Sequence, residues 1–127
     1  MVKATQQVPG GPGGTYGGVA MVKVTVLYDQ PQDPAAFETY YWETHVPKHG
    51  QQIPNVIKLE ANKAVGDDAP FYRSADLYFE SMASFQASME SPITQAAIAD
   101  LDNFAKGRHK VLITEVQPVK SLATMKV

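Results

Sequence analysis

The absence of cysteine, of long apolar runs and of a dominant charge narrows what this chain can be. With no cysteine among its 127 residues, the chain has no disulfides, no thiolate chemistry and no cysteine-ligated zinc or iron–sulfur centre. No segment approaches the ~18 continuous apolar residues that a membrane-spanning helix needs. The net charge is only −2, with the two signs scattered, which argues against a nucleic-acid or anionic-membrane partner.

What is present is the composition of an ordinary globular domain. Apolar residues make up 44% and charged residues 19% of the chain, close to the averages for such domains. This length suits one domain, which buries roughly two-thirds of its unfolded surface without a covalent staple. Lys3 is the only basic residue in the first 20, and no apolar run of ~7–15 residues follows it, so we expect no secretory signal and a cytoplasmic location.

The two ends differ from the rest of the sequence. Residues 1–20 hold six of the nine glycines, a composition that buries too little apolar surface to offset its ordering entropy. We expect a flexible arm, or alternatively a translation start at Met21, because Met21-Val22-Lys23 repeats Met1-Val2-Lys3. Residues 118–127 form a polar C-terminal tail, which leaves one domain over residues 21–117.

The first half of the domain shows a strand and then a helix. Apolar residues at every second position predict a strand over residues 22–28. Asp33 suits a helix N-cap and Pro34 a first helical position, and apolar residues then recur at helical spacing. Pro47 is expected to end or kink that helix, with a short second piece between His49 and Ile53.

The second half predicts a hairpin, two helices and a last strand. The strands are expected over residues 56–65, 71–79 and 111–116. Ser81 suits the cap of a short helix, and Ser91-Pro92 starts a longer one that ends near Gly107. The order β-α-β-β-α-α-β is the α+β, ferredoxin-like (βαββαβ) arrangement, with helices on one face of an antiparallel four-stranded sheet.

The other face of this sheet carries mostly polar side chains. They are Thr25, Tyr72, Ser74, Asp76 and Tyr78. Such a face is awkward for a monomer, and packing against a second copy would cover it, so we expect a homodimer through this face. Asp76 would lie inside that interface and need a partner, for which Lys23 and Arg73 are candidates by position.

Four segments of the sequence form a recognisable series. They are Phe37-x-x-Tyr40-Tyr41-x-x-Thr44-His45-Val46-Pro47, Ile53-Pro54, Ala75-x-Leu77-x-Phe79-x-Ser81, and Ser91-Pro92 followed by Ala99-Asp100-Leu101-x-Asn103-Phe104. Over residues 21–116 the chain resembles the EthD-type (ethyl tert-butyl ether degradation) family of the dimeric α+β barrel superfamily. The resemblance implies a homodimer with facing sheets, and a small-molecule cavity between each sheet and its own helices. It leaves the function open, because similar folds include polyketide cyclases, cofactor-independent monooxygenases, muconolactone isomerase and haem-handling proteins.

His45 is the first candidate for chemistry. It lies four residues after Tyr41 and eight after Phe37, so the three share one helix face. On an apolar face, desolvation favours the neutral imidazole, which can act as a base near neutral pH. Alternatively, His45 is structural, and its ring bonds free carbonyl groups at the helix end.

The neighbouring tyrosines could orient a substrate oxygen. Consecutive helical residues diverge by ~100°, so only one of Tyr40 and Tyr41 can point squarely inward. We favour Tyr41 for its spacing from His45, and its phenol would steer an enol or phenolate. Tyr40 would then line the cavity edge or face the partner subunit. The alternative for both is aromatic core packing.

The remaining candidate groups do not form a recognisable metal or carboxylate site. His45 and His49 are four apart, like a helical metal pair, but Pro47 disturbs the helix between them, and His109 would reach them only by chance of the fold. We expect no metal and no cofactor. Haem would use His45 as an axial ligand, and nothing else in the sequence indicates it. Asp100 lies two residues before Asp102, on a different helix face, and is expected to face solvent or cap locally.

Three possibilities remain open, two functions that use a pocket and, third, a structural dimeric module with only a vestigial cavity. The first is a cofactor-independent acid–base enzyme of isomerase, cyclase or monooxygenase type, acting on a small apolar carbonyl or aromatic compound in a degradation pathway. His45 would move the proton and Tyr41 would orient the oxygen. The second is a non-catalytic accessory or carrier for a hydrophobic intermediate, such as one linked to ether degradation. In both, the pocket would be lined by Val24, Val26, Phe37, Tyr40, Leu77, Phe85 and Phe104.

Overall fold

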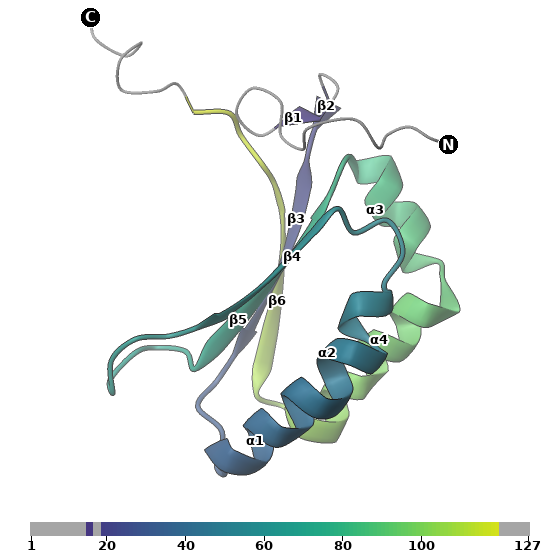
Figure 1. Cartoon of the computed structure of the whole chain (residues 1–127). Coiled ribbons are helices and arrows are strands. Elements are labelled where there is room, and N and C mark those ends of the chain that lie inside the picture. Colours follow the sequence, from purple (N-terminus) through teal and green to yellow (C-terminus); the bar gives the residue numbers. More distant parts are fainter. Residues whose placement is uncertain (1–14, 17–18, 120–127) are drawn as a thin grey trace, which may run out of the picture.

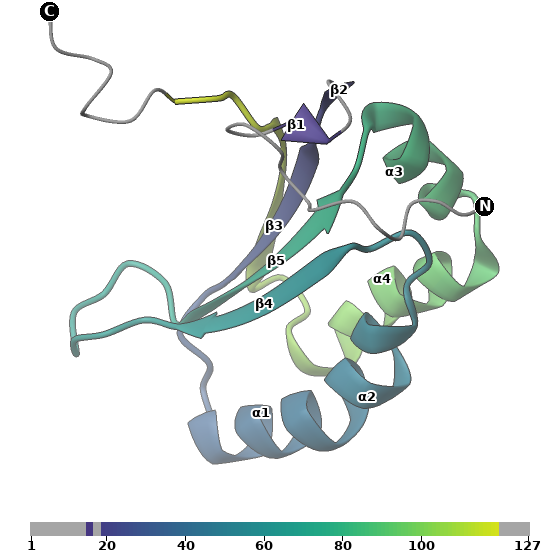
Figure 2. The same ribbon diagram turned by 45° about the horizontal axis from the view of Figure 1, so that its top comes forward.

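A four-stranded antiparallel sheet carries the helices of the described residues on one of its faces (Figures 1 and 2). The structure, a computed structural model, describes residues 15–16 and 19–119. The strands are β3 (Val22–Tyr28), β4 (Lys58–Lys63), β5 (Arg73–Phe79) and β6 (His109–Glu115), in the spatial order β4-β5-β3-β6. This confirms the ferredoxin-like α+β arrangement.

The first helical segment is continuous and contains a wide turn. α1 (Pro34–Tyr40) runs directly into a π-helical turn, η1 (Tyr41–His45), and then into α2 (Val46–Lys48). The Asp33 carboxylate accepts a hydrogen bond from the Ala36 amide at 3.0 Å, as expected of an N-cap. The π-helical turn lies just before Pro47 and α2 ends one residue after it, at Lys48, as expected of a proline that ends or kinks a helix. The short second piece appears as a 3₁₀ turn, η2 (Gly50–Gln52).

Two further helices complete the helical layer. α3 (Met82–Met89) and α4 (Pro92–Phe104) begin at the predicted serine caps, whose hydroxyl groups accept from Ser84 and Ile93 amides at 3.1 Å. Gly107 lies in the loop after α4 with a φ of 70°, a left-handed conformation that glycine adopts without strain. No helix in the described part of the chain is long and apolar enough to cross a membrane.

The last strand begins two residues before the predicted start. His109 already pairs with Tyr28 across β3 and β6, because backbone hydrogen bonds in the ladder extend to the end of β3. Since side chains alternate along a strand, His109 shares a face with Val111 and Ile113. That face looks towards the helices.

The polar sheet face differs from the prediction at Asp76. Its carboxylate accepts hydrogen bonds from Thr25 Oγ1 at 2.6 Å and from Asn62 Nδ2 at 3.0 Å. The prediction that Lys23 or Arg73 would pair with Asp76 was wrong. Neutral donors on the flanking strands satisfy Asp76, and Arg73 points to the opposite face.

Tyr72 also lies on the other side of the sheet from the one predicted. It is buried, its ring centroid is 5.3 Å from that of Phe37, and its hydroxyl donates to Glu38 at 2.8 Å. The cause is a bend at Tyr72, just before β5, so the side-chain alternation starts only at Arg73.

Part of the N-terminal arm has regular structure. β1 (Thr15–Tyr16) and β2 (Val19–Ala20) pair as a small antiparallel ribbon. We expected residues 1–20 to be flexible. Of these, residues 1–14 and 17–18 lie outside the described residues. The same is true of residues 120–127 in the expected tail.

Candidate active site

A cavity of about 290 Å³ lies between the sheet and its helices. Ligand pockets start at about 300 Å³, so this volume suits a small molecule. Its wall is mainly aliphatic, and the described residues that line it include no lysine, arginine, aspartate or glutamate. The polar side chains on the wall are those of Tyr28, Tyr41, His45, Thr94 and His109.

The structure separates the predicted pocket residues into two groups. Val24, Val26, Leu77 and Phe85 line the cavity, together with both predicted catalytic residues, Tyr41 and His45.

Phe37, Tyr40 and Phe104 do not line the cavity, contrary to the prediction. Phe37 and Phe104 belong to an aromatic cluster behind it, with their ring centroids 5.2 Å apart. Phe104 also lies 4.7 Å from the His45 ring and 5.3 Å from the Tyr40 ring. Edge-to-face and stacked packing of this kind stabilises the core beyond simple burial, so these rings support the site from behind.

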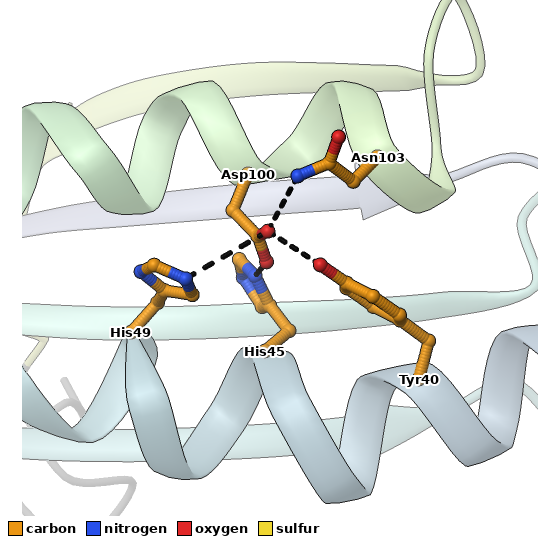
Figure 3. A network of polar contacts seen from close by, with 5 residues as sticks. All are labelled: Tyr40, His45, His49, Asp100 and Asn103. Atoms are coloured by element: carbon orange, nitrogen blue, oxygen red, sulfur yellow. Dashed lines mark hydrogen bonds and ion pairs between the residues drawn. The ribbon is translucent and has the colours of Figure 1, made fainter.

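His45 is held by a carboxylate from another helix. Its Nδ1 lies 2.8 Å from Asp100 Oδ2, and the two residues are only 8% and 5% exposed (Figure 3). An ionised carboxylate can only accept, so Nδ1 carries the proton of the neutral ring and Nε2 carries the lone pair. The hydrogen bond that His45 makes to another described side chain uses Nδ1 and not Nε2. The arrangement therefore leaves a basic nitrogen on a residue of the cavity wall.

Asp100 is the centre of the polar network. Its Oδ1 accepts from the Tyr40 hydroxyl at 2.6 Å and from Asn103 Nδ2 at 2.8 Å, and it lies 3.7 Å from His49 Nε2 (Figure 3). The expectation that Asp100 faces solvent or caps locally was wrong. α4 packs its buried face on the π-helical turn, and Asp100 lies on that face.

The spacing of Asp100 along the helix already indicated in the sequence that its side chain lies on the inward face. Asp100 stands three residues after the apolar Ala97 and four before Phe104, which was predicted to line the pocket. Spacings of three and four place residues on one helix face.

Burial and hydrogen bonding determine the charge states of His45 and Asp100. Burial lowers the pKa of His45, and the Asp100 carboxylate only partly offsets this. Burial alone would raise the pKa of Asp100, but hydrogen bonds from Tyr40, Asn103 and His45 outweigh it, so the net pKa lies below its usual value. The pair is thus a neutral imidazole beside an ionised carboxylate at neutral pH.

Tyr41 is a second polar residue of the cavity wall. It is 1% exposed, and its ring centroid lies 6.1 Å from that of His45. Burial raises its pKa, so the phenol keeps its proton. Within the described ranges, no three metal-ligating side chains gather in one place.

Comparison with known proteins identifies the family. The sequence matches the EthD domain over residues 29–108. The chain belongs to the EthD family. An uncharacterised 11.0 kDa protein of the thcB-thcC intergenic region of Rhodococcus erythropolis is 42% identical over 102 residues, which cover 78% of this chain and 98% of that protein. An EthD family protein from Bacillus halodurans is 30% identical, with a TM-score of 0.71 over 76% of this chain and 99% of that one.

More distant solved structures share the EthD fold. A dimeric ferredoxin-like protein of unknown function from Thermobifida fusca is 17% identical, with a TM-score of 0.59 over 78% of this chain and 93% of that one. The hydroxynitrile lyase from Passiflora edulis is 13% identical, with a TM-score of 0.60 over 80% and 97% of the two chains. At these identities the likeness shows the fold alone. EthD-like folds of this kind thus include dimers and enzymes.

Proposed function

We propose that this EthD-family protein is a cofactor-independent acid–base enzyme acting on a small, uncharged carbonyl or aromatic compound. The observation that carries the proposal is the His45–Asp100 pair at the wall of an apolar cavity. His45 Nε2 would take a proton from the substrate, and Asp100 would stabilise the imidazolium that forms. Tyr41 would donate a hydrogen bond to the oxygen on which negative charge develops.

The cavity wall supports an uncharged, largely apolar substrate. A charged group placed there would lose its hydration without gaining an ionic partner from the lining residues. An apolar cavity of about 150 Å³ already holds benzene, so about 290 Å³ suits one substituted ring. The lyase of Passiflora edulis acts on a small molecule with this same fold, which is consistent with such a use.

The test is proton exchange at the carbon next to a ketone. Cyclohexanone in deuterium oxide loses its α-proton signals in NMR as a base removes them. We expect the protein to accelerate this exchange and His45→Gln to lower the rate by about 100-fold or more. Asp100→Asn should also lower it, because the neutral amide cannot stabilise the imidazolium.

Asp102→Asn is the matched control, since Asp102 is exposed on the same helix. Its exchange rate should equal that of the wild type. An unchanged rate in His45→Gln would contradict the proposal.

A carrier function is the second candidate, and the aliphatic wall of the cavity favours it. The two functions differ in pH dependence. Catalysis by His45 loses rate as the pH falls through the lowered pKa of its imidazole, because the protonated ring is no longer a base. Binding of cyclohexanone to a simple apolar carrier should not change over the same range.

A further inference from the structure

We propose that His109 is a second acid–base group of the same cavity, and that the substrate is a β,γ-unsaturated carbonyl compound whose double bond moves into conjugation. This rests on the proposed function of His45 and narrows the reaction to an isomerisation. His109 is on the cavity wall because β6 starts at this residue, and it shares its face with Val111 and Ile113.

The hydrogen bond of His109 fixes which nitrogen is free. Its Nδ1 lies 2.9 Å from the carbonyl oxygen of Ala105. A carbonyl oxygen only accepts, so Nδ1 carries a proton, and Nε2 is the nitrogen that can gain or lose one. The hydrogen bond that His109 makes within the described residues uses Nδ1 and not Nε2. His109 thus repeats, with a backbone acceptor, the arrangement that Asp100 creates at His45.

The two histidines reach the cavity from different elements. His45 comes from the π-helical turn, whereas His109 comes from the edge strand β6. Phe104 packs on the His45 ring at 4.7 Å and on the Tyr28 ring at 5.7 Å, and Tyr28 is the cross-strand partner of His109. A small ligand between these walls would therefore meet an imidazole at two separate positions.

Two separated imidazoles suit a reaction that removes a proton at one carbon and adds one at another. His45 Nε2 takes the α proton, and the electron pair of that C–H bond moves to give a dienolate whose oxygen accepts from the Tyr41 hydroxyl. Nε2–H of protonated His109 then gives its proton to the γ carbon, and the double bond becomes conjugated. No oxidant is needed, and the extra proton on His45 returns to His109 through solvent, which partly buried His109 can reach.

The experiment uses a β,γ-unsaturated cyclohexenone with the full-length protein in deuterium oxide. Ultraviolet absorbance follows formation of the conjugated isomer, and NMR follows deuterium uptake at the α carbon. In His109→Gln we expect isomerisation to fall about 100-fold while α exchange continues at the wild-type rate. In His45→Gln both rates should fall. Lys110→Gln, an exposed neighbour on the opposite face of β6, should leave both unchanged.

The outcomes separate this inference from the proposed function. Isomerisation at the wild-type rate in His109→Gln overturns the role of His109, as does α exchange without isomerisation in the wild type. Absence of both reactions in the wild type overturns the proposed function as well.

A second measurement covers the case in which His109→Gln does not fold. Phenol, a stable mimic of the dienol, is titrated into the ¹⁵N-labelled wild type. The Nε2 resonance of His109 should shift on binding, and an unmoved resonance contradicts the proposal.

Discussion

At the scale of single residues, Asp100 determines what His45 can do. A lone histidine at the buried end of a helix would be consistent with a structural role. The 2.8 Å contact to a carboxylate that also accepts from Tyr40 and Asn103 fixes the tautomer and directs the lone pair to Nε2. Burial of the pair then favours the basic, neutral imidazole.

These charge states predict how stability depends on pH. The pKa of folded His45 lies below the ordinary value of 6.5. Above pH 6.5, His45 is neutral in both the folded and the unfolded chain, so it adds no pH dependence to the free energy of unfolding. As the pH falls below that value, the unfolded chain binds a proton that folded His45 refuses, so the free energy of unfolding decreases until the folded pKa is reached. Thermal unfolding followed by circular dichroism should show Tm falling in this range.

The variant His45→Gln isolates that effect. It should lack the decline just below pH 6.5, because it has no imidazole at this position. Asp100 acts at lower pH, since its pKa is below the ordinary 3.8, and its contribution is lost as the pH falls through that lowered pKa. Identical pH profiles of Tm for wild type and His45→Gln would contradict the assignment.

Sequence reasoning found His45 and Tyr41 but not Asp100. The first two stand four residues apart on an apolar helix face, a local signal. Asp100 meets His45 across 55 positions of the chain, and only the packing of α4 on the π-helical turn brings them together. A carboxylate on the inward face of a helix indicates a functional site only when the residue that it contacts elsewhere in the chain is known.

At the scale of elements, the π-helical turn and the length of β6 shape the site. The strand order, helix caps and hairpin followed from alternation and turn chemistry. The π turn did not, because its sequence reads as an ordinary helix interrupted by Pro47. The early start of β6 depends on pairing with β3 and Tyr28, a tertiary contact, and it is this start that brings His109 to the cavity.

Glu38 joins α1 to β5 and predicts a large effect of one substitution. Its carboxylate accepts from Arg73 at 2.8 Å and from the Tyr72 hydroxyl at 2.8 Å, and Arg73 is only 5% exposed. Glu38→Ala leaves a buried guanidinium without its anion, which should reduce the free energy of unfolding by about 2–3 kcal/mol, since partial exposure of Glu38 moderates the cost. Urea denaturation measures it.

Glu43→Ala provides the comparison for Glu38→Ala. Glu43 is exposed in the same helical segment, and its removal should change the free energy of unfolding by less than about 0.5 kcal/mol. Equal effects of the two substitutions would show that the contact with β5 contributes nothing specific.

At the scale of the whole molecule, the sheet has one face without helices. Asp76, Thr25 and Asn62 form a hydrogen-bonded group on that face, and Lys23 and Lys58 lie over the Tyr78 ring. We propose that a second copy covers this face, because its polar side chains are already hydrogen-bonded to one another within one subunit. Side chains already paired within one subunit can enter an interface at low cost.

Native mass spectrometry measures the assembly. The expected mass is twice the 13.8 kDa of one chain. Replacing Thr25 by Arg should shift the protein to monomers, because the longer side chain would stand out from the open face and occupy the space in which the second copy packs. A wild type that is monomeric at micromolar concentration, or a Thr25→Arg dimer of unchanged stability, would count against this interface.

The central claim is that His45 is a neutral base held by Asp100, and NMR titration of the ¹⁵N-labelled imidazole tests it most directly. The account predicts a proton on Nδ1, a lone pair on Nε2 and a titration midpoint below 6.5. Asp100→Asn should remove this tautomer preference. A proton on Nε2 in the wild type, or a midpoint above 6.5, would contradict the account.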